Sequence, residues 1–109
     1  MKFEDIKFEK HTNKYGTGLA LLLCGKYWVP RGDVQLAWDH FSTAVLPVDN
    51  QTEVDAQMLF GEPEAVWKAM VVGKRIALGR CLKYFVDHEW LPLEVANPGK
   101  GGKRRYIRI

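Results

Sequence analysis

Apolar residues recur at helical spacing in the middle of the chain and predict two helices there. The first covers 34–45, with Asp33 as its N-cap and Pro47 beyond its end. Its apolar stripe consists of Val34, Ala37, Trp38, Phe41 and Val45. The run Thr52–Phe60 predicts a shorter helix, because it opens like a capping box in which an aspartate replaces the usual glutamate.

Two further helices are predicted in the second half, separated by a break at Val71-Val72-Gly73. The sequence Glu62-Pro63-Glu64 suits a helix start, because proline fits the first turn and acids favour the positive end of the helix dipole. The apolar face of this short helix consists of Val66, Trp67 and Met70. The longer helix covers 74–88. Its core face consists of Leu78, Cys81, Leu82, Phe85 and Val86.

Strands are predicted at both ends of the chain. Alternation in 91–96 and 103–109, around the turn Asn97–Gly102, indicates a C-terminal β-hairpin. Residues 1–15 fit either a strand or a short helix. The apolar run 19–29 fits a buried helix or strand that ends in a short strand before Pro30. The chain is therefore predicted to be an α+β fold and a single domain, with an N-terminal apolar segment (1–30) ahead of a helical and hairpin core (33–109).

Composition narrows the class of protein. The chain has 109 residues, 47% hydrophobic and 27% charged, as expected of one globular domain. Its longest apolar run, Leu19–Cys24, is too short to span a membrane, and residues 1–10 contain no signal-peptide core. Cys24 and Cys81 both lie among apolar residues and are expected to be buried thiols in a reducing compartment. We therefore expect a cytoplasmic protein without a membrane partner.

Charge is distributed unevenly along the chain. Residues 1–61 carry a net charge of −2, whereas residues 62–109 carry +5. Five cations close the basic half without an intervening acid: Lys100, Lys103, Arg104, Arg105 and Arg108. Such a run is typical of proteins that bind a phosphate backbone. A solvated, solubilising tail is the alternative interpretation.

The predicted helix 74–88 also carries cations away from its core face. Arg80 and Lys83 are three residues apart, so they are expected to lie on one exposed ridge. Lys74 and Arg75 occupy the first turn, where a cation opposes the helix dipole. Local helix stability therefore does not explain these two residues, whereas an anionic partner would. An ordinary solvated helix face is the alternative.

The order of these elements resembles the winged helix-turn-helix superfamily over about residues 61–109. The resemblance rests on the short helix from Glu62-Pro63-Glu64, the turn at Gly73, the longer helix with a basic outer face, and the basic hairpin in 91–109. The segment 1–30 is unusual ahead of such a domain and is expected to add a strand layer or a dimerisation surface. The small size and this first half also resemble phage or plasmid accessory proteins.

The resemblance implies that the protein binds duplex DNA. The helix 74–88 would enter the major groove, and the wing 100–108 would lie on flanking phosphates or in the minor groove. Gly79 would allow a close approach of the ligand, although close helix packing would also explain a glycine there. The implied nucleic-acid-binding residues are Lys74, Arg75, Gly79, Arg80, Lys83, Lys100, Lys103, Arg104, Arg105 and Arg108.

Catalytic and metal chemistry is not predicted. The histidines His11, His40 and His88 have no metal-ligand spacing, and the glycines near the C-terminus lack the ending of a phosphate-binding loop. We therefore expect neither an enzyme nor a bound metal or cofactor.

Two other functions fit the same sequence. One is a protein-interaction or inhibitor module of a mobile genetic element, which would apply the basic surface to an acidic protein. The other is RNA binding, in which aromatic side chains would stack on bases. The candidates for stacking are Tyr84, Phe85, Trp90 and Tyr106. A homodimer is compatible with each function.

Overall fold

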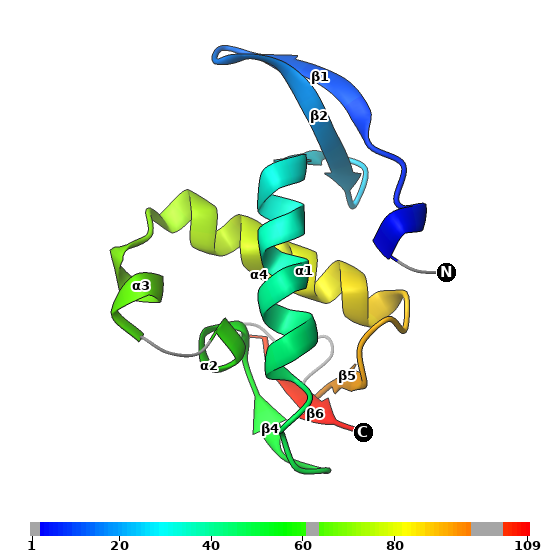
Figure 1. Ribbon diagram of the computed structural model, residues 1–109, viewed down its shortest axis with the longest axis vertical. Coiled ribbons are helices and arrows are strands. Elements are labelled where there is room, and N and C mark those ends of the chain that lie inside the picture. The colour runs from blue at the N-terminus through cyan, green and yellow to red at the C-terminus, as the bar shows by residue number, and fades with distance from the viewer. Residues whose placement is uncertain (1–2, 61–63, 97–103) are drawn as a thin grey trace.

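The computed structural model describes residues 3–60, 64–96 and 104–109, and its fold is mixed α+β, as predicted (Figure 1). The helices of these ranges are a 3₁₀ turn η1 (Phe3–Asp5), α1 (Arg31–Ala44), α2 (Ala56–Phe60), α3 (Glu64–Ala69) and α4 (Val72–Asp87). The strands are β1 (Glu9–Asn13), β2 (Gly16–Leu23), β3 (Tyr27–Pro30), β4 (Glu53–Val54), β5 (Leu93–Val95) and β6 (Tyr106–Arg108). They form two antiparallel sheets, ordered β1-β2-β3 and β4-β6-β5.

The two sheets lie at opposite ends of the molecule, and α1 and α4 cross between them (Figure 1). A continuous cluster of buried side chains links both sheets to these helices, from Ile6 before β1 to Tyr106 in β6. No helix in the described ranges combines the length and apolar character needed to cross a bilayer.

The N-terminal segment is a three-stranded sheet, and both structures considered for residues 1–15 occur in it, as η1 and β1. Leu21 and Leu23 of β2 are buried, whereas Leu22 and Leu19 are 37% and 41% exposed. Leu22 is exposed because successive residues of a strand alternate between its faces, whereas Leu19, on the same face as Leu21, lies beyond the part of β2 that pairs with β3. The expectation that the whole run is buried is therefore wrong.

A tight turn joins β2 to β3 and exposes Cys24. Cys24 and Gly25 both have positive φ values, of 55° and 71°, and the Lys26 N–H donates to the Leu23 carbonyl oxygen at 3.1 Å. These are the features of a type I′ turn, here within a three-residue connection, because Leu23 pairs with Tyr27. The prediction of a buried thiol is thus wrong for Cys24 and confirmed for Cys81, which is fully buried on α4.

The first long helix begins three residues earlier than predicted. Its N-cap is Pro30, which has extended backbone angles and provides no side-chain cap. Asp33 therefore lies inside the first turn and is not the N-cap. There its carboxylate complements the helix dipole. The apolar stripe is oriented as predicted, with Val34, Ala37 and Phe41 buried.

The short helices differ from the prediction mainly at their starts. Asp55 caps α2, because its Oδ1 accepts from the Met58 N–H at 2.9 Å, and so Thr52 is not the cap. Trp67 anchors α3 against α2 through Phe60, with ring centroids 5.3 Å apart. Val66, predicted on the same apolar face, is 45% exposed. Of the predicted helix start Glu62-Pro63-Glu64, the first two residues lie outside the described ranges, and α3 begins at Glu64.

The long helix α4 begins at Val72, two residues before the predicted Lys74, and ends at Asp87. Gly73 therefore belongs to its first turn, and the connection from α3 is shorter than expected. The N-cap is the extended residue Val71, which provides no capping side chain. The predicted core face is confirmed in full, since all five of its residues are buried.

The C-terminal hairpin is confirmed and gains a third strand. β6 pairs with β5 and, on its other side, with the two-residue strand β4. Tyr106 lies opposite both Val54 and Val95 and is 2% exposed. The central strand of this sheet is therefore part of the core.

The C-terminus of α4 forms a Schellman motif without a glycine. The Trp90 N–H donates to the Phe85 carbonyl oxygen, and the Glu89 N–H to the Val86 carbonyl oxygen, both at 3.0 Å. The Trp90 and Phe85 rings, 6.0 Å apart, make the accompanying hydrophobic contact. Glu89 has the left-handed φ of 60° that this motif usually assigns to glycine.

We expect Glu89→Gly to stabilise the fold by about 0.5–1 kcal/mol, because relief of left-handed strain exceeds the added entropy of the unfolded chain. Urea denaturation followed by circular dichroism measures the change. The matched control is Glu94→Gly in β5, which removes the same charge from a strand and is expected to destabilise the fold by about 0.5–1 kcal/mol. Equal effects of the two substitutions would contradict this interpretation.

Candidate nucleic-acid interface

The predicted interface consists of α4 and the C-terminal hairpin, and the short α3–α4 connection positions the start of α4. The Lys74 and Arg75 N–H groups both reach back to the Val71 carbonyl oxygen, at 3.0 and 3.2 Å. The Met70 N–H donates to the Trp67 carbonyl oxygen at 3.2 Å. Two consecutive helices are thus joined with almost no loop, and the first turn of α4 is fixed by its own backbone.

The two cations in that first turn face the body of the protein. Lys74 Nζ lies 3.8 Å from Asp33 Oδ1 of α1. Arg75 is half-buried, and within the described part of the chain its Nε has no hydrogen-bond partner. Asp33 therefore explains why a cation is tolerated at the position of Lys74. An anionic ligand is not needed there.

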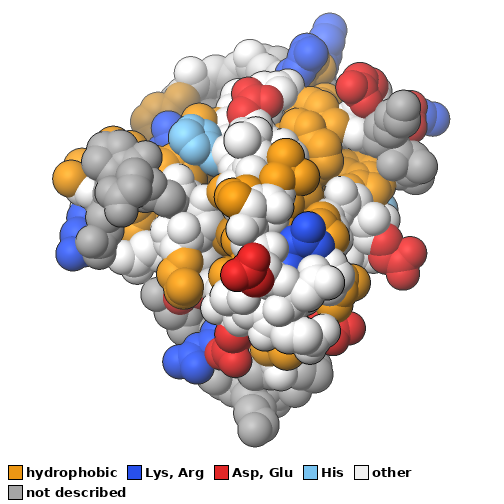
Figure 2. Space-filling model, turned by 60° about the horizontal axis from the view of Figure 1, so that its bottom comes forward, with side chains coloured by type: hydrophobic (Ala, Val, Ile, Leu, Met, Phe, Trp, Pro, Cys, Tyr) orange, Lys and Arg blue, Asp and Glu red, His pale blue; other side chains and the backbone are white. Residues whose placement is uncertain are grey.

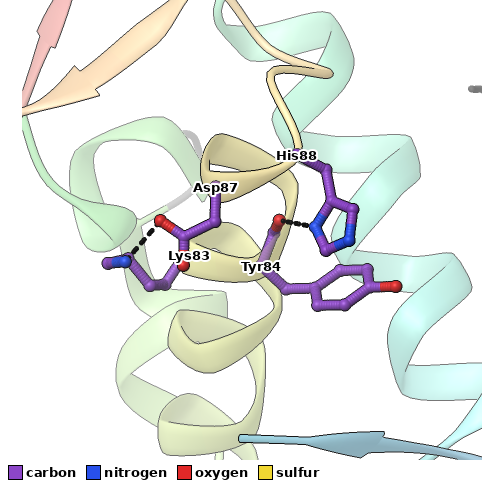
Figure 3. Close-up of polar contacts among 4 residues, drawn as sticks. All are labelled: Lys83, Tyr84, Asp87 and His88. Atoms are coloured by element: carbon purple, nitrogen blue, oxygen red, sulfur yellow. Dashed lines mark hydrogen bonds and ion pairs between the residues drawn. The ribbon is translucent and has the colours of Figure 1, made fainter.

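Arg80 packs on the N-terminal sheet. Its guanidinium carbon lies 3.4 Å from the centroid of the Tyr27 ring in β3, a close cation–π contact. Lys83, three residues further along, instead forms an ion pair with Asp87, one turn away on α4 (Figure 3). The expected single ridge of Arg80 and Lys83 is therefore divided between two different contacts.

The end of α4 next to Lys83 is capped by a histidine. The Nδ1–H of His88 donates to the Tyr84 carbonyl oxygen at 2.9 Å (Figure 3). This contact satisfies one of the carbonyl groups left free at a helix C-terminus. His88 thus caps the C-terminus of α4. In this contact its Nδ1 faces a backbone carbonyl group and not a catalytic side chain.

Gly79 lies half-buried on α4 between the core face and the outer face. A Cβ atom built at this position would meet nothing within 4 Å. Close helix packing therefore does not account for this glycine. Of the two roles that the sequence suggests for Gly79, the prediction that it allows a close approach of the ligand is the one that this geometry leaves open.

Two arginines of the hairpin are engaged in contacts that hold the sheet. Arg108 donates from Nε to the Val45 carbonyl oxygen at 3.1 Å, which ties β6 to the end of α1. Arg105 Nη1 lies 3.0 Å from Glu53 Oε1 on the neighbouring strand β4. Arg104 is exposed and adjoins the buried Tyr106 hydroxyl. Lys100 and Lys103 lie outside the described residues.

Burial raises the pKa of Tyr106 to about 12. Burial is the larger cause, Arg104 opposes it, and Asp87 adds to it. The Tyr106 hydroxyl thus stays protonated and lies in the fields of Arg104 on the hairpin and Asp87 on α4.

The ion pairs that Lys83 and Arg105 form with carboxylates lie at the surface. Lys83 and Asp87 are 29% and 51% exposed, and Arg105 and Glu53 are 60% and 49% exposed. Surface ion pairs contribute at most about 1 kcal/mol, so a phosphate group can displace the carboxylate at small cost. Figure 2, which views the end formed by β4, β5 and β6, shows cations interspersed with acids and apolar side chains.

An apolar corner surrounds the α3–α4 connection, where the sequence led us to expect only cations as binding residues. We define it as Val66, Val71, Val72 and Ile76, which are 45%, 72%, 60% and 46% exposed. The signal was present in the sequence, because Val72 and Ile76 are four residues apart and lie off the core face of the helix. Exposed apolar clusters of this kind are typical of contact surfaces.

The described side chains contain no metal-ligand set, and the Cys81 thiol is buried. In residues 3–60, 64–96 and 104–109, no three His, Cys, Asp or Glu side chains come together as a ligand set. Burial, reinforced by the negative charge of Asp33, raises the pKa of the Cys81 thiol to about 12. Cys81 is therefore a thiol, and not the thiolate that acts as a nucleophile, at neutral pH.

Comparison with known protein families, with curated proteins and with solved structures finds no match for this chain.

The raised pKa of Cys81 predicts a loss of stability at high pH. Below its ordinary pKa of 9.0 the thiol is protonated in both the folded and the unfolded chain. Between 9.0 and about 12 only the unfolded chain releases the proton, so the free energy of unfolding falls as pH rises. We expect the stability difference between the wild type and Cys81→Ala to be constant near neutral pH and to shrink above pH 9.0. Urea denaturation at each pH measures it, and a pH-independent difference would contradict the assignment.

Proposed function

We propose that this protein binds duplex DNA as a winged helix domain, with α3 and α4 as the helix-turn-helix and the β5–β6 hairpin as the wing. The observation that carries the proposal is the acid-free run of five cations from Lys100 to Arg108. This run leads into β6, which pairs with the strand that follows α4. Of these cations, Arg104 and Arg105 directly precede β6 and Arg108 ends it, so a strand that is paired on both sides holds these three near one another.

Contacts to phosphates, rather than to bases, dominate in this proposal. Arg80, the side chain best suited to read guanine, is occupied by Tyr27. The first outward turn of α4 presents Val72 and Ile76, which offer no hydrogen-bond donors. Lys83 and Arg105 can exchange exposed carboxylate partners for phosphates. Binding is therefore expected to depend strongly on salt and weakly on sequence.

The double substitution Lys103→Ala with Arg104→Ala tests the wing. We expect it to weaken binding to every duplex alike and to reduce the slope of log affinity against log salt by about 1.8, because two phosphate contacts are lost. Fluorescence anisotropy with a labelled random duplex across a salt series measures both quantities.

The matched control for the wing is Lys103→Arg with Arg104→Lys, which keeps both charges and is expected to bind as the wild type. Unchanged affinity of the alanine variant at low salt would refute the wing assignment. Absence of wild-type binding at low salt would refute DNA binding altogether.

A second candidate function, docking of a protein, is favoured by the apolar corner. Its four side chains flank the part of α4 that a DNA-binding protein would insert into the groove, yet they offer no hydrogen bonds to base edges. Apolar residues at such a position suit a protein surface with a basic rim, as in an interaction or inhibitor module.

A double variant, Val71→Ser and Val72→Ser, distinguishes protein docking from DNA binding. Both side chains are largely exposed, and a serine at position 71 can supply the N-cap that α4 lacks, so the fold is expected to be retained and stabilised by about 1 kcal/mol. If the corner docks a protein, the variant loses the partner that the wild type captures from host extract and keeps its affinity for duplex DNA. Loss of DNA affinity with retention of the protein partner would contradict this second function.

A further inference from the structure

The β1–β2 hairpin extends beyond the rest of its sheet. β3 pairs only with residues 20–23 of β2, whereas β1 pairs along the full length from Asn13↔Gly16 to Glu9↔Ala20. Residues 10–19 are therefore a two-stranded ribbon without a third strand. The ribbon projects from the rest of the molecule (Figure 1). Within residues 10–19 only His11 is partly buried.

Local contacts hold this ribbon in place of a core. His11 stacks on Trp28 at the base, with ring centroids 4.4 Å apart. The Thr12 and Thr17 hydroxyl oxygens lie 2.7 Å apart across the strands. At the tip, Asn13 Oδ1 accepts from the Tyr15 N–H at 2.8 Å. An isolated two-stranded hairpin is marginally stable in water, so a ribbon that projects without core contacts is readily explained by an external partner.

The charge of the N-terminal sheet identifies the chemistry of that partner. The sheet, residues 9–30, contains three Lys and one Glu, which gives it a net charge of +2 in a half of the chain whose overall charge is negative. Residues 10–32, which run from β1 into the first turn of α1, contain four Lys or Arg and no Asp or Glu. Among the described residues, neither Lys10 nor Lys14 of the ribbon has a carboxylate partner. These two lysines thus differ from Lys74, Lys83 and Arg105, whose charges are paired.

The tip of the ribbon adds an exposed aromatic ring and bare backbone. Tyr15 is 85% exposed, and Lys14 Nζ lies 5.1 Å from the centroid of its ring. Gly16 and Gly18 leave one face of the strand without side chains, and a Cβ atom at either would meet nothing within 4 Å. A glycine in a strand often marks a site where a ligand approaches the backbone closely.

We propose that the β1–β2 ribbon is a second DNA-binding element, which inserts its tip into a groove of the duplex and places Lys10 and Lys14 on phosphates. The inference rests on the proposed DNA-binding function. A two-stranded ribbon fits the major groove, which is about 12 Å wide. Strands are used in this way by several β-ribbon DNA-binding proteins.

The position of the ribbon supports a two-point contact. The ribbon and the β4–β6–β5 sheet lie at opposite ends of the longest axis of the molecule, which measures 41 Å (Figure 1). Successive turns of duplex DNA are about 34 Å apart. The molecule is thus long enough for the ribbon and the β4–β6–β5 sheet to contact one duplex at points within about one helical turn of each other.

The experiment compares two double variants. The alanine variant carries Lys10→Ala and Lys14→Ala, and the charge-preserving control, the arginine variant, carries Lys10→Arg and Lys14→Arg. The probe is a fluorescein-labelled random duplex of roughly 24 base pairs, about two helical turns. At about 50 mM salt we expect the alanine variant to bind at least about tenfold more weakly and its salt slope to be lower by about 1.8. The arginine variant is expected to bind as the wild type. Tyr15→Ala, which keeps all charges, is expected to weaken binding without changing the slope.

The outcomes separate this inference from the proposed function. If the wild type binds the duplex and the alanine variant binds equally well, the ribbon is not a contact and the inference is overturned, while DNA binding stands. If the wild type does not bind at all, both proposals are overturned. If light scattering detects a wild-type dimer that the alanine variant loses while DNA affinity is unchanged, the ribbon pairs with a second copy and the inference is also overturned. Circular dichroism melting checks that each variant is folded.

Discussion

The contact between α1 and α4 holds every other element of this structure in position. Trp38 of α1 meets Phe85 of α4 edge to face at 5.2 Å, and Trp90 covers Phe85 beyond the end of α4. The N-terminal sheet packs on both helices, with Leu21 and Leu23 in the same buried cluster. Arg108 ties the other sheet to the end of α1. A change in the crossing would therefore move the ribbon and the hairpin relative to each other.

Much of the helical part of the fold could be predicted from periodicity. The core face of α4 is predicted correctly at every position. Apolar residues spaced three and four apart over a segment of this length indicate a helix and do not fit a strand. The helix starts are less accurate, since neither Pro30 nor Val71 supplies a capping side chain that the sequence would reveal. The strand β4 has only two residues and exists through its pairing with β6, so no local pattern marks it.

The N-terminal sheet was ambiguous for a different reason. Leu21, Leu22 and Leu23 are consecutive, so the alternation that identifies a half-buried strand is hidden by an apolar residue on the outer face. The type I′ turn was hidden too, because Cys24 occupies a position where asparagine is the usual residue.

The candidate interface was predictable in its direction but not in its contacts. A helical wheel places Arg80 and Lys83 on the outer side of α4, as found, yet Tyr27 is 53 positions before Arg80 and comes close only through the fold. Arg105 and Glu53 are 52 positions apart, and Arg108 and Val45 are 63 positions apart, so these contacts also form only through the fold. The acid-free stretch from residue 10 to 32 was readable in the sequence and was obscured by averaging charge over the whole first half.

The position of β6 within its sheet bears on how the protein folds during synthesis. β6 is the central strand, and the two strands that it joins both precede it in the chain. Until the ribosome has released Tyr106, β4 and β5 have no common neighbour, and the core lacks one of its largest buried side chains. Pairing across such a sequence separation carries a large loop-closure entropy. The helices can thus form early, whereas cooperative folding of the whole chain has to wait until this strand has been translated.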